Sequence, residues 1–267
     1  SSHHTSRAAE ARVPWADSMA EGTPDEMDDA APLQAKMDRV HWVPLESNPD
    51  ILNEFAHKAG MSEKWQFVDI FSLDLLDMVP EGAVAVTLLF KCTKVLSEFK
   101  LAQRARIEKD TQTVSEGLVY LKQYIGNACG TIACIHSLAN NEKAIGLEQE
   151  TPLGKFLAEI KGKSPAEAGA LLADAKDLHA ASEESASGGQ TAAPEATAST
   201  DHHFIAFVEK DGDVYELDGG KAFPINHGKI PSDGNFLQAA ARVIQTNFMD
   251  LDKTEIEFNM MALAPAE

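Results

Sequence analysis

The sequence predicts an α+β fold in which helices flank a mixed β-sheet. Three observations carry this prediction: apolar runs typical of strands open the globular region, helical stretches fill its middle, and a hairpin and a last strand follow late in the chain. Strands separated by blocks of helices are typical of a sheet covered by helices. A chain of 267 residues, 44% of them hydrophobic, can bury a sizeable core, as one large domain or two small ones.

The first elements follow one another closely. Three segments rich in apolar residues read as strands: residues 42–45, 67–71 and 83–90. Pro44 favours a sheet edge for the first, because proline has no N–H to offer a neighbouring strand. The third is apolar throughout, which favours a strand buried on both faces. Asn48 and Gly60 bracket a helix, since asparagine often caps a helix start and glycine often follows its end.

Helices dominate the middle of the chain. Five stretches are predicted to be helical: residues 95–107, 114–123, 130–140, one from about 151 and one from about 164. The last two begin with Pro152 and Pro165, and proline suits the first turn because its missing N–H would have no partner there. A final helix at 232–248 and a strand at 255–263 complete the pattern.

Residues 182–200 interrupt this pattern. The segment reads SEESASGGQTAAPEATAST and contains no bulky apolar residue. Such a composition is typical of a flexible loop, and a loop this long inside a compact domain often has a function. The alternative is a simple tether between two elements.

The clearest hairpin lies at residues 203–209 and 213–218, two runs rich in apolar and β-branched residues with Asp211-Gly212 between them. If Asp211 and Gly212 form a two-residue turn, the register of the two strands follows. Each residue of the first strand then faces a fixed residue of the second.

This register predicts a histidine–aspartate pair. Asp218 lies opposite Ile205, and the alternation of side chains along a strand places Ile205 and His203 on the same face. Asp218 is then a diagonal neighbour of His203, within reach of the imidazole. A carboxylate beside an imidazole fixes its tautomer and raises its basicity. A different turn length would instead leave an exposed histidine and an unrelated aspartate.

Cys129 is the candidate nucleophile. It directly precedes the helical stretch 130–140, so its thiol would lie at a helix N-terminus, close to free N–H groups and the positive end of the dipole. This position lowers the pKa of a thiol and favours the nucleophilic thiolate. The alternative for Cys129 is a buried structural thiol, and we interpret Cys92 and Cys134 as small core residues.

Gln123 lies six residues before Cys129, at the end of the helix predicted at 114–123. A glutamine amide and the backbone N–H of the nucleophile can together stabilise the oxyanion of a tetrahedral intermediate. The chain order glutamine, cysteine, histidine, aspartate is that of papain-like thiol peptidases. The four residues together predict acyl transfer through a thiol.

Composition narrows the classes of partner. The 42 acidic residues exceed the 23 basic ones, and the net charge of −19 argues against nucleic acid and anionic membranes and favours a basic partner. No apolar run is long enough to cross a bilayer. Three cysteines form no even disulfide framework, so we expect a reduced cytoplasmic protein, with the nucleus as a second compartment. Residues 1–36 lack apolar periodicity, and we interpret them as a disordered acidic extension or a tag.

Several segments match a known family in order along the chain. The segment QYIGNACGT around Cys129, and the segments HFIAFV and YELDG that hold the histidine and the aspartate, resemble the active-site segments of the ubiquitin carboxyl-terminal hydrolases. Four shorter segments resemble that family's short, single-domain isozymes: residues 42–46, 65–69, 223–228 and 258–263. Tyr124 departs from the family pattern, in which threonine is more usual, and so does Gly220, where an arginine often follows Asp-Gly.

The resemblance implies a papain-like α/β/α sandwich over residues 37–267, with a mostly antiparallel six-stranded sheet and a knotted backbone. It implies a cysteine-type hydrolase that releases small or unfolded adducts from the C-terminal glycine of ubiquitin, with a ubiquitin-like protein as a further candidate substrate. Cys129, His203 and Asp218 would form the catalytic triad. Residues 182–200 would be the crossover loop, under which the leaving group passes.

The same resemblance suggests how ubiquitin is bound. Asp69 is the acid best placed for an arginine of the ubiquitin tail, which ends in Leu-Arg-Leu-Arg-Gly-Gly. Pro44 and Leu45 would contact the tail in its cleft. A solvated acid at Asp69, and a core or edge role for the other two, are the alternatives.

We expect no cofactor and no metal. His202, His203 and His227 have no tetrahedral ligand spacing, and no paired-cysteine motif accompanies them. We expect a monomer. Two rival interpretations remain: a non-catalytic ubiquitin-binding module, and a papain-like acyl-transfer enzyme with another substrate.

Overall fold

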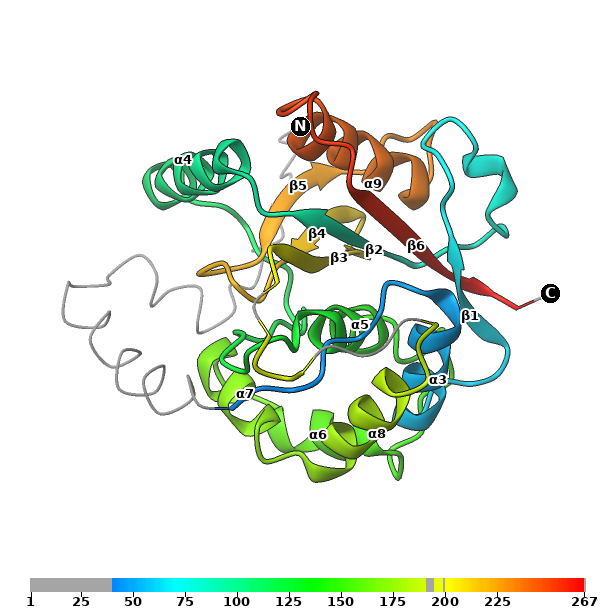
Figure 1. The fold of residues 1–267 in the computed structure, drawn as a ribbon. Helices are drawn as coiled ribbons and strands as arrows, with labels where there is room; N and C mark the ends of the chain where they lie inside the picture. The colour runs from blue at the N-terminus through cyan, green and yellow to red at the C-terminus, as the bar shows by residue number, and fades with distance from the viewer. Residues whose placement is uncertain (1–39, 191–194, 199, 267) are drawn as a thin grey trace, which may run out of the picture.

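The computed structural model describes residues 40–190, 195–198 and 200–266, so the extension predicted at residues 1–36 lies outside the described part (Figure 1). In chain order, the helices and strands are α3 (Pro49–Ala59), β1 (Trp65–Asp69), the short 3₁₀ helix η1 (Leu76–Met78), β2 (Ala85–Lys91), α4 (Lys94–Asp110), α5 (Cys129–Ala139), α6 (Pro152–Ile160), α7 (Pro165–Leu172), α8 (Lys176–Ala186), β3 (His202–Lys210), β4 (Asp213–Leu217), β5 (Ile225–Lys229), α9 (Phe236–Ile244), the π-helical turn η2 (Gln245–Met249) and β6 (Phe258–Pro265).

A six-stranded sheet with the order β1-β6-β2-β3-β4-β5 forms the middle layer (Figure 1). Each ladder between neighbouring strands of this sheet is antiparallel. This confirms the antiparallel sheet that the family resemblance implies and corrects the mixed sheet inferred from the order of elements. The apolar strand β2 pairs with both β3 and β6, and Val86 and Leu88 are almost fully buried, as its sequence predicts. The knotted backbone path stays a prediction.

Helices cover both faces of this sheet. The helices α3, α5, α6, α7 and α8 lie on one face, and α9 with η2 lies on the other (Figure 1). Two clusters of buried apolar residues separate the layers, one around α5 and one around α9. The predicted sandwich of three layers is therefore confirmed. No helix in the described part of the chain is long and apolar enough to span a membrane.

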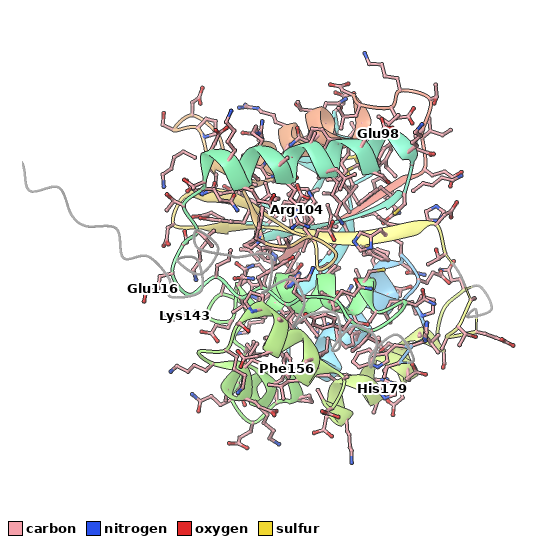
Figure 2. All side chains as sticks on the ribbon, turned by 90° about the vertical axis from the view of Figure 1, so that its left-hand side faces the viewer. Glu98, Arg104, Glu116, Lys143, Phe156 and His179 are labelled. Atoms are coloured by element: carbon pink, nitrogen blue, oxygen red, sulfur yellow. The ribbon has the colours of Figure 1, made fainter. Side chains whose placement is uncertain are left out.

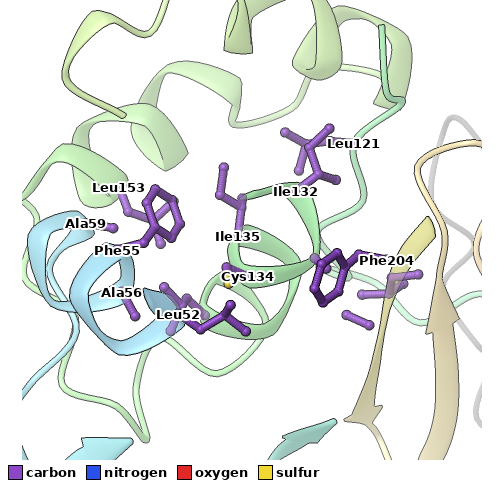
Figure 3. Packing of buried hydrophobic residues seen from close by; sticks show 14 of the residues in the cluster. Leu52, Phe55, Ala56, Ala59, Leu121, Ile132, Cys134, Ile135, Leu153 and Phe204 are labelled. Atoms are coloured by element: carbon purple, nitrogen blue, oxygen red, sulfur yellow. The ribbon is translucent and has the colours of Figure 1, made fainter. Parts of the chain in front are cut away.

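Helix α5 lies at the centre of the larger cluster. Each of its residues from Cys129 to Ala139 is buried, including the polar residues Thr131, His136 and Ser137. Figure 3 shows α5 between α3, which contributes Leu52 and Phe55, and Phe204 of β3. This packing fixes the first residue of α5 relative to the sheet.

Helix ends follow the predicted capping residues. The Asn48 side chain accepts a hydrogen bond of 2.9 Å from the backbone N–H of Asp50 at the start of α3. Gly60 follows α3 with φ of 122°, a conformation that side chains with a Cβ rarely adopt. At α7, Ser164 and Glu167 form a reciprocal capping box.

The helix predicted at residues 114–123 is wrong. The segment is neither helix nor strand: it turns at residues 116–117, with Gly117 at φ of 74°, and some of its backbone N–H groups bond to distant partners. The N–H of Leu121 donates to His136 Nε2 at 2.9 Å, and the N–H of Gln123 donates to the Gly219 carbonyl at 2.9 Å. The apolar residues of this segment repeat at helical spacing, which is why the sequence pattern predicts a helix. Hydrogen bonds to distant residues keep the backbone out of the helical conformation, and the sequence pattern does not reveal them.

The strand predicted at residues 42–45 is also wrong. His41 forms a single isolated bridge to Gly126, and no ladder continues from it. Pro44 has no N–H, and the N–H of Val43 donates to the Glu183 carboxylate at 2.8 Å instead of a strand.

Other elements also differ from the prediction. The sequence does not predict strand β5, because its residues INHGK have little apolar character. The last helix begins at Phe236, where the Asn235 side chain caps it, rather than at residue 232. The first residues of the predicted loop 182–200 belong to α8, where Ser182 and Ser185 are fully buried despite their polarity.

Candidate active site

Cys129 is the first residue of α5 and is 8% exposed. The residue before it, Ala128, has no side chain that could cap the helix. The N–H groups of the first turn of α5 therefore have no capping side chain as their acceptor. Burial opposes ionisation of Cys129, but the His203 side chain and the backbone N–H groups of Phe204 and Gly130 favour the thiolate. Their combined effect lowers the pKa of Cys129 below the usual value for a thiol.

His203 is the second residue of β3, and its ring lies between Cys129 and Asp218. Its Nε2 lies 2.7 Å from Asp218 Oδ1, which leaves Nδ1 as the ring nitrogen for the thiol. The Phe90 ring packs edge-on against the imidazole, with centroids 5.9 Å apart. Burial alone would lower the pKa of His203, but the Asp218 carboxylate and then Cys129 raise it to about 10. The pair therefore favours thiolate and imidazolium at neutral pH.

Asp218 follows β4 directly and is 2% exposed. Its Oδ1 accepts from His203 and from the backbone N–H of Gly220 at 2.8 Å. Its Oδ2 accepts from Lys100 Nζ of α4 at 3.0 Å. Burial opposes ionisation, but His203 and Lys100 hold the pKa of Asp218 far below its usual range. The carboxylate is therefore charged and fixed at both oxygens.

The strand register behind this contact is the predicted one. The β3–β4 ladder pairs Lys210 with Asp213 and Ala206 with Leu217. Continuing the ladder by one pair places Asp218 opposite Ile205 and diagonal to His203. The sequence argument for the histidine–aspartate pair is confirmed.

Gln123 lies beside the same site, although the helix predicted around it does not form. Its Nε2 donates to the Ile125 carbonyl at 3.1 Å, so one of its two amide N–H groups is used. Gln123 also lines a cavity of about 280 Å³ together with His203. The other lining residues of this cavity are His41, Tyr124, Ile125, Gly126 and Gly220. The predicted oxyanion donor is thus brought to the histidine.

The structure separates the three cysteines. Cys134 is fully buried in the α5 core, and burial raises the pKa of its thiol, as expected for a core residue. Cys92 directly follows β2 and is exposed, so its interpretation as a core residue is wrong. Partial desolvation, which His203 and Lys100 only partly offset, raises the pKa of Cys92. The thiol with a lowered pKa is that of Cys129.

The candidate tail-binding residues differ in accessibility. Asp69 ends β1 and is half-buried, and burial, followed by nearby Asp50, raises its pKa. Pro44 is half-buried, whereas Leu45 is 5% exposed and belongs to the core cluster around α5. A Cβ added at Gly130 would lie 3.3 Å from the Leu45 Cβ, so Leu45 packs on the first turn of α5. The structure favours the core alternative for Leu45, and substrate contacts by the other two stay predictions.

Asn127, two residues before Cys129, contacts the predicted crossover loop. Its Nδ2 donates to the carbonyls of Ala196 at 2.7 Å and of Ala198 at 2.8 Å. Asn127 has φ of 60°, a left-handed conformation that asparagine tolerates better than most residues. The described part of the loop therefore lies against the segment that carries the thiol. Residues 191–194 and 199 lie outside the description.

The other two histidines considered for a metal have carboxylate partners. His227 Nε2 lies 2.9 Å from Glu216, and His202 Nε2 lies 3.0 Å from Glu257. No group of three or more histidine, cysteine, aspartate or glutamate side chains in residues 40–190, 195–198 and 200–266 could hold a metal ion.

Comparisons with known proteins agree with this site. The family model described as "Ubiquitin carboxyl-terminal hydrolase, family 1" matches residues 42–249. A ubiquitin carboxyl-terminal hydrolase of Drosophila melanogaster is 39% identical over 228 residues, which cover 85% of this chain and 98% of that protein. The isozyme L1 of Homo sapiens is 36% identical over 225 residues, which cover 84% of this chain and 98% of that protein.

Solved structures show the same fold. The catalytic domain of Trichinella spiralis UCH37, bound to ubiquitin vinyl methyl ester, is similar with a TM-score of 0.68 and 22% identity. The match covers 88% of this chain and 100% of that domain. A longer form of the same protein, also bound to ubiquitin vinyl methyl ester, gives a TM-score of 0.62 at 23% identity, covering 84% of this chain and 82% of that one.

Proposed function

Because the chain belongs to family 1 of the ubiquitin carboxyl-terminal hydrolases, which are cysteine-type enzymes, we propose that it releases small or unfolded adducts from the C-terminal glycine of ubiquitin. The observation that carries this proposal is the geometry at the start of α5. A buried thiol of lowered pKa meets an imidazole that a buried carboxylate holds.

Acylation begins at Cys129. Its thiolate attacks the carbonyl carbon of the C-terminal glycine, and the electron pair of the carbonyl moves onto oxygen. When the tetrahedral intermediate collapses, the bond to the leaving amine, alcohol or thiol breaks. The imidazolium of His203 gives its proton to that leaving group, and a thioester joins ubiquitin to Cys129.

Deacylation uses the same groups in reverse. Neutral His203 accepts a proton from a water molecule that attacks the thioester carbonyl. The C–S bond of the thioester then breaks, which restores the thiolate beside the imidazolium, and the released carboxylic acid of ubiquitin loses its remaining proton to water. Asp218 keeps Nε2 of His203 protonated throughout, so that Nδ1 is the nitrogen that exchanges the proton.

The oxyanion needs donors aimed at it in both steps. The backbone N–H of Cys129 is a first-turn donor of α5, which has no acceptor within the helix. The second amide N–H of Gln123 Nε2 is the other donor in this proposal, and its position in the cavity beside His203 supports the role. Such donors stabilise the transition state most because the site is largely shielded from water.

Ubiquitin is the partner that the family indicates, and the charge of the chain suits it. The net charge of −19 attracts a tail that carries two arginines. Asp69 is half-buried at the end of β1, where a cation could replace the water that its carboxylate has lost. A second substrate among the ubiquitin-like proteins would need a comparable basic tail.

Hydrolysis of ubiquitin that carries a small C-terminal ester tests this function. We expect turnover by the wild type, and no turnover by Cys129→Ser, which keeps the fold but lacks a thiolate. Cys92→Ser is the matched control, because it removes an exposed thiol outside the proposed triad. Equal activity of Cys129→Ser and the wild type would overturn the proposal.

A further inference from the structure

Helix α4 (Lys94–Asp110) projects from the body of the fold at one end of the sheet (Figure 1). Of its residues, Leu96 and Gln103 are buried, so it lacks the apolar stripe that attaches most surface helices. Figure 2 shows α4 along its length, with Glu98 and Arg104 labelled on it. Polar contacts must therefore contribute much of what positions this helix.

Two of these contacts reach the segment that carries Asp218. Lys100 Nζ lies 3.0 Å from Asp218 Oδ2, and Gln103 Oε1 accepts a hydrogen bond of 2.7 Å from Lys221 Nζ. The Asp218 side chain is 3% exposed and that of Lys100 is 38% exposed. A half-exposed helix thus places one cation on the buried carboxylate of the active site.

The contact completes the hydrogen bonding of this carboxylate. His203 and the Gly220 N–H both donate to Oδ1, whereas Lys100 donates to Oδ2. With donors at both oxygens, the carboxylate plane is fixed and Oδ1 stays aimed at Nε2. Without Lys100, the carboxylate would have one hydrogen bond fewer to break when it rotates, so its orientation would be less well fixed.

Gly220 leaves the space that this contact needs. A Cβ at position 220 would lie 3.1 Å from Asp218 Oδ1 and 3.1 Å from Lys100 Nζ. It would also lie 3.8 Å from His203 Nε2. Distances near 3.1 Å are tighter than ordinary van der Waals contact, so a side chain here would press on both partners of the contact and displace the flexible end of Lys100. The glycine at position 220, where the family pattern often has an arginine, thus leaves room for Lys100 to reach Asp218.

We propose that Lys100 is a positioning residue of the active site, which fixes the Asp218 carboxylate in the orientation that holds His203, and that Gly220 keeps the space for it. The proposal rests on the proposed function, because it concerns the same reaction. It adds α4 to the elements that build the site. The reacting atoms are not touched by Lys100, which acts through Asp218.

The charge of Lys100 gives this role a signature in the pH profile. Lys100 and the imidazolium of His203 share one carboxylate, so removing the lysine charge lets His203 keep its proton to a higher pH. The polar or charged groups near Asp218 and His203 come from several elements. They are Lys100 of α4, Lys221 and the Gly220 N–H of the following loop, Tyr120 and Lys122 before α5, Glu216 of β4, Cys92 after β2, and Cys129 and His136 of α5. Among these, Lys100 is changed in the test while the others stay.

The test compares Lys100→Met, which keeps the length of the side chain, with Lys100→Arg, which keeps its charge. Loss of a hydrogen bond to a charged group should lower kcat by about tenfold in Lys100→Met, with KM within about twofold of wild type. The basic limb of the kcat/KM profile should move to higher pH. Lys100→Arg should keep most of the wild-type kcat, and the basic limb of its kcat/KM profile should lie at the wild-type pH. Lys94→Met is the matched control, because Lys94 of the same helix pairs with exposed Glu98 and should leave both unchanged.

Two results would overturn the positioning role. One is a Lys100→Met enzyme with wild-type kcat and pH profile. The other is a fall in kcat without movement of the basic limb, or with the same fall in Lys94→Met, which would indicate general loss of helix structure. Thermal unfolding of each variant checks that the fold is kept.

A double-mutant cycle tests the part of Gly220. Gly220→Ala should lower kcat in the wild type but add little in Lys100→Met, because both changes remove the same contact. Fully additive effects would contradict the link between the two residues.

A second readout does not depend on ubiquitin. In a Cys92→Ser background, the rate at which iodoacetamide alkylates Cys129 reports the thiolate–imidazolium pair directly. The pH dependence of this rate should shift upward at its basic limb in Lys100→Met and not in Lys94→Met. If Cys129 of the wild type is alkylated rapidly but the enzyme does not hydrolyse ubiquitin esters, the proposed function is refuted. The alkylation rates would still test the positioning role of Lys100. Absence of the shift would refute the role of Lys100 while the hydrolase function stands.

Discussion

His203 Nε2 and Asp218 Oδ1 lie 2.7 Å apart across the β3–β4 hairpin. The turn at Asp211-Gly212 makes these two residues neighbours, because it fixes which residues face each other and so which share a face of the sheet. Gly212 has φ of 80° and Asp211 has φ of 53°, as a tight two-residue hairpin turn requires. The active site therefore depends on a turn near the far end of the hairpin.

Asp218→Asn should lower turnover by orders of magnitude with little change in affinity for ubiquitin. Burial opposes the charged imidazole, and the Asp218 carboxylate, followed by Cys129, raises the pKa of His203 to about 10, so loss of the carboxylate charge lowers that pKa. The imidazolium then no longer supports the thiolate at neutral pH, and the pKa of Cys129 rises. Steady-state kinetics measures the first effect, and alkylation of Cys129 by iodoacetamide near pH 7 measures the second. Wild-type values of both would mean that the hairpin pair has no part in the reaction.

Gln123→Ala should reduce kcat by roughly 10²–10³-fold if its amide stabilises the oxyanion. Its effect on alkylation of Cys129 should be small, because alkylation forms no oxyanion. This contrast separates loss of an oxyanion donor from loss of the thiolate. If both rates fall together, Gln123 supports the structure of the site rather than the transition state.

The segment around Gln123 shows which features of the fold the sequence can predict and which it cannot. The helix caps, the hairpin register and the helix-terminal Cys129 all depend on residues close in sequence, and the structure confirms them. The sequence pattern predicts a helix around Gln123, but no helix forms, because the backbone of this segment bonds to His136 and Gly219. Such partners are set by tertiary packing and leave no local periodicity.

The position of Lys100 could not be predicted for a related reason. Its partner Asp218 lies 118 residues further along the chain. On α4 it looks like any solvated lysine, and Gly220 looks like a minor departure from the family pattern. Only the fold shows that the two positions meet at one carboxylate.

Asp69→Lys should raise KM for ubiquitin substrates several-fold and leave kcat nearly unchanged, because a carboxylate that faces an arginine of the tail becomes a like charge. Added salt should weaken binding of ubiquitin to the wild type more than to the variant, since screening acts on the attraction that the variant lacks. Asp74→Lys is a suitable control, because Asp74 is exposed on the loop after β1. Equal KM values for all three proteins would contradict the role of Asp69.

A longer crossover loop should admit larger leaving groups. Insertion of about ten Gly/Ser residues after Gly189 costs little in closure entropy and leaves α8 and the Asn127 contacts in place. We expect faster cleavage of diubiquitin with unchanged cleavage of a small ester. An insertion of the same length in the exposed turn after α6, at Gly162, controls for general effects on the fold. If the preference for small adducts persists, the loop acts as a tether only.

Covalent capture by ubiquitin vinyl methyl ester tests the central claim most directly, because it requires ubiquitin binding and a nucleophilic thiolate together. We predict one ubiquitin added per chain, mapped by mass spectrometry to Cys129 and kept in Cys92→Ser, with no adduct in Cys129→Ser. Binding of ubiquitin without an adduct would indicate a non-catalytic ubiquitin-binding module. Rapid alkylation of Cys129 by iodoacetamide, without binding of ubiquitin or an adduct with the probe, would indicate a thiol enzyme with another substrate. Either result would contradict the account.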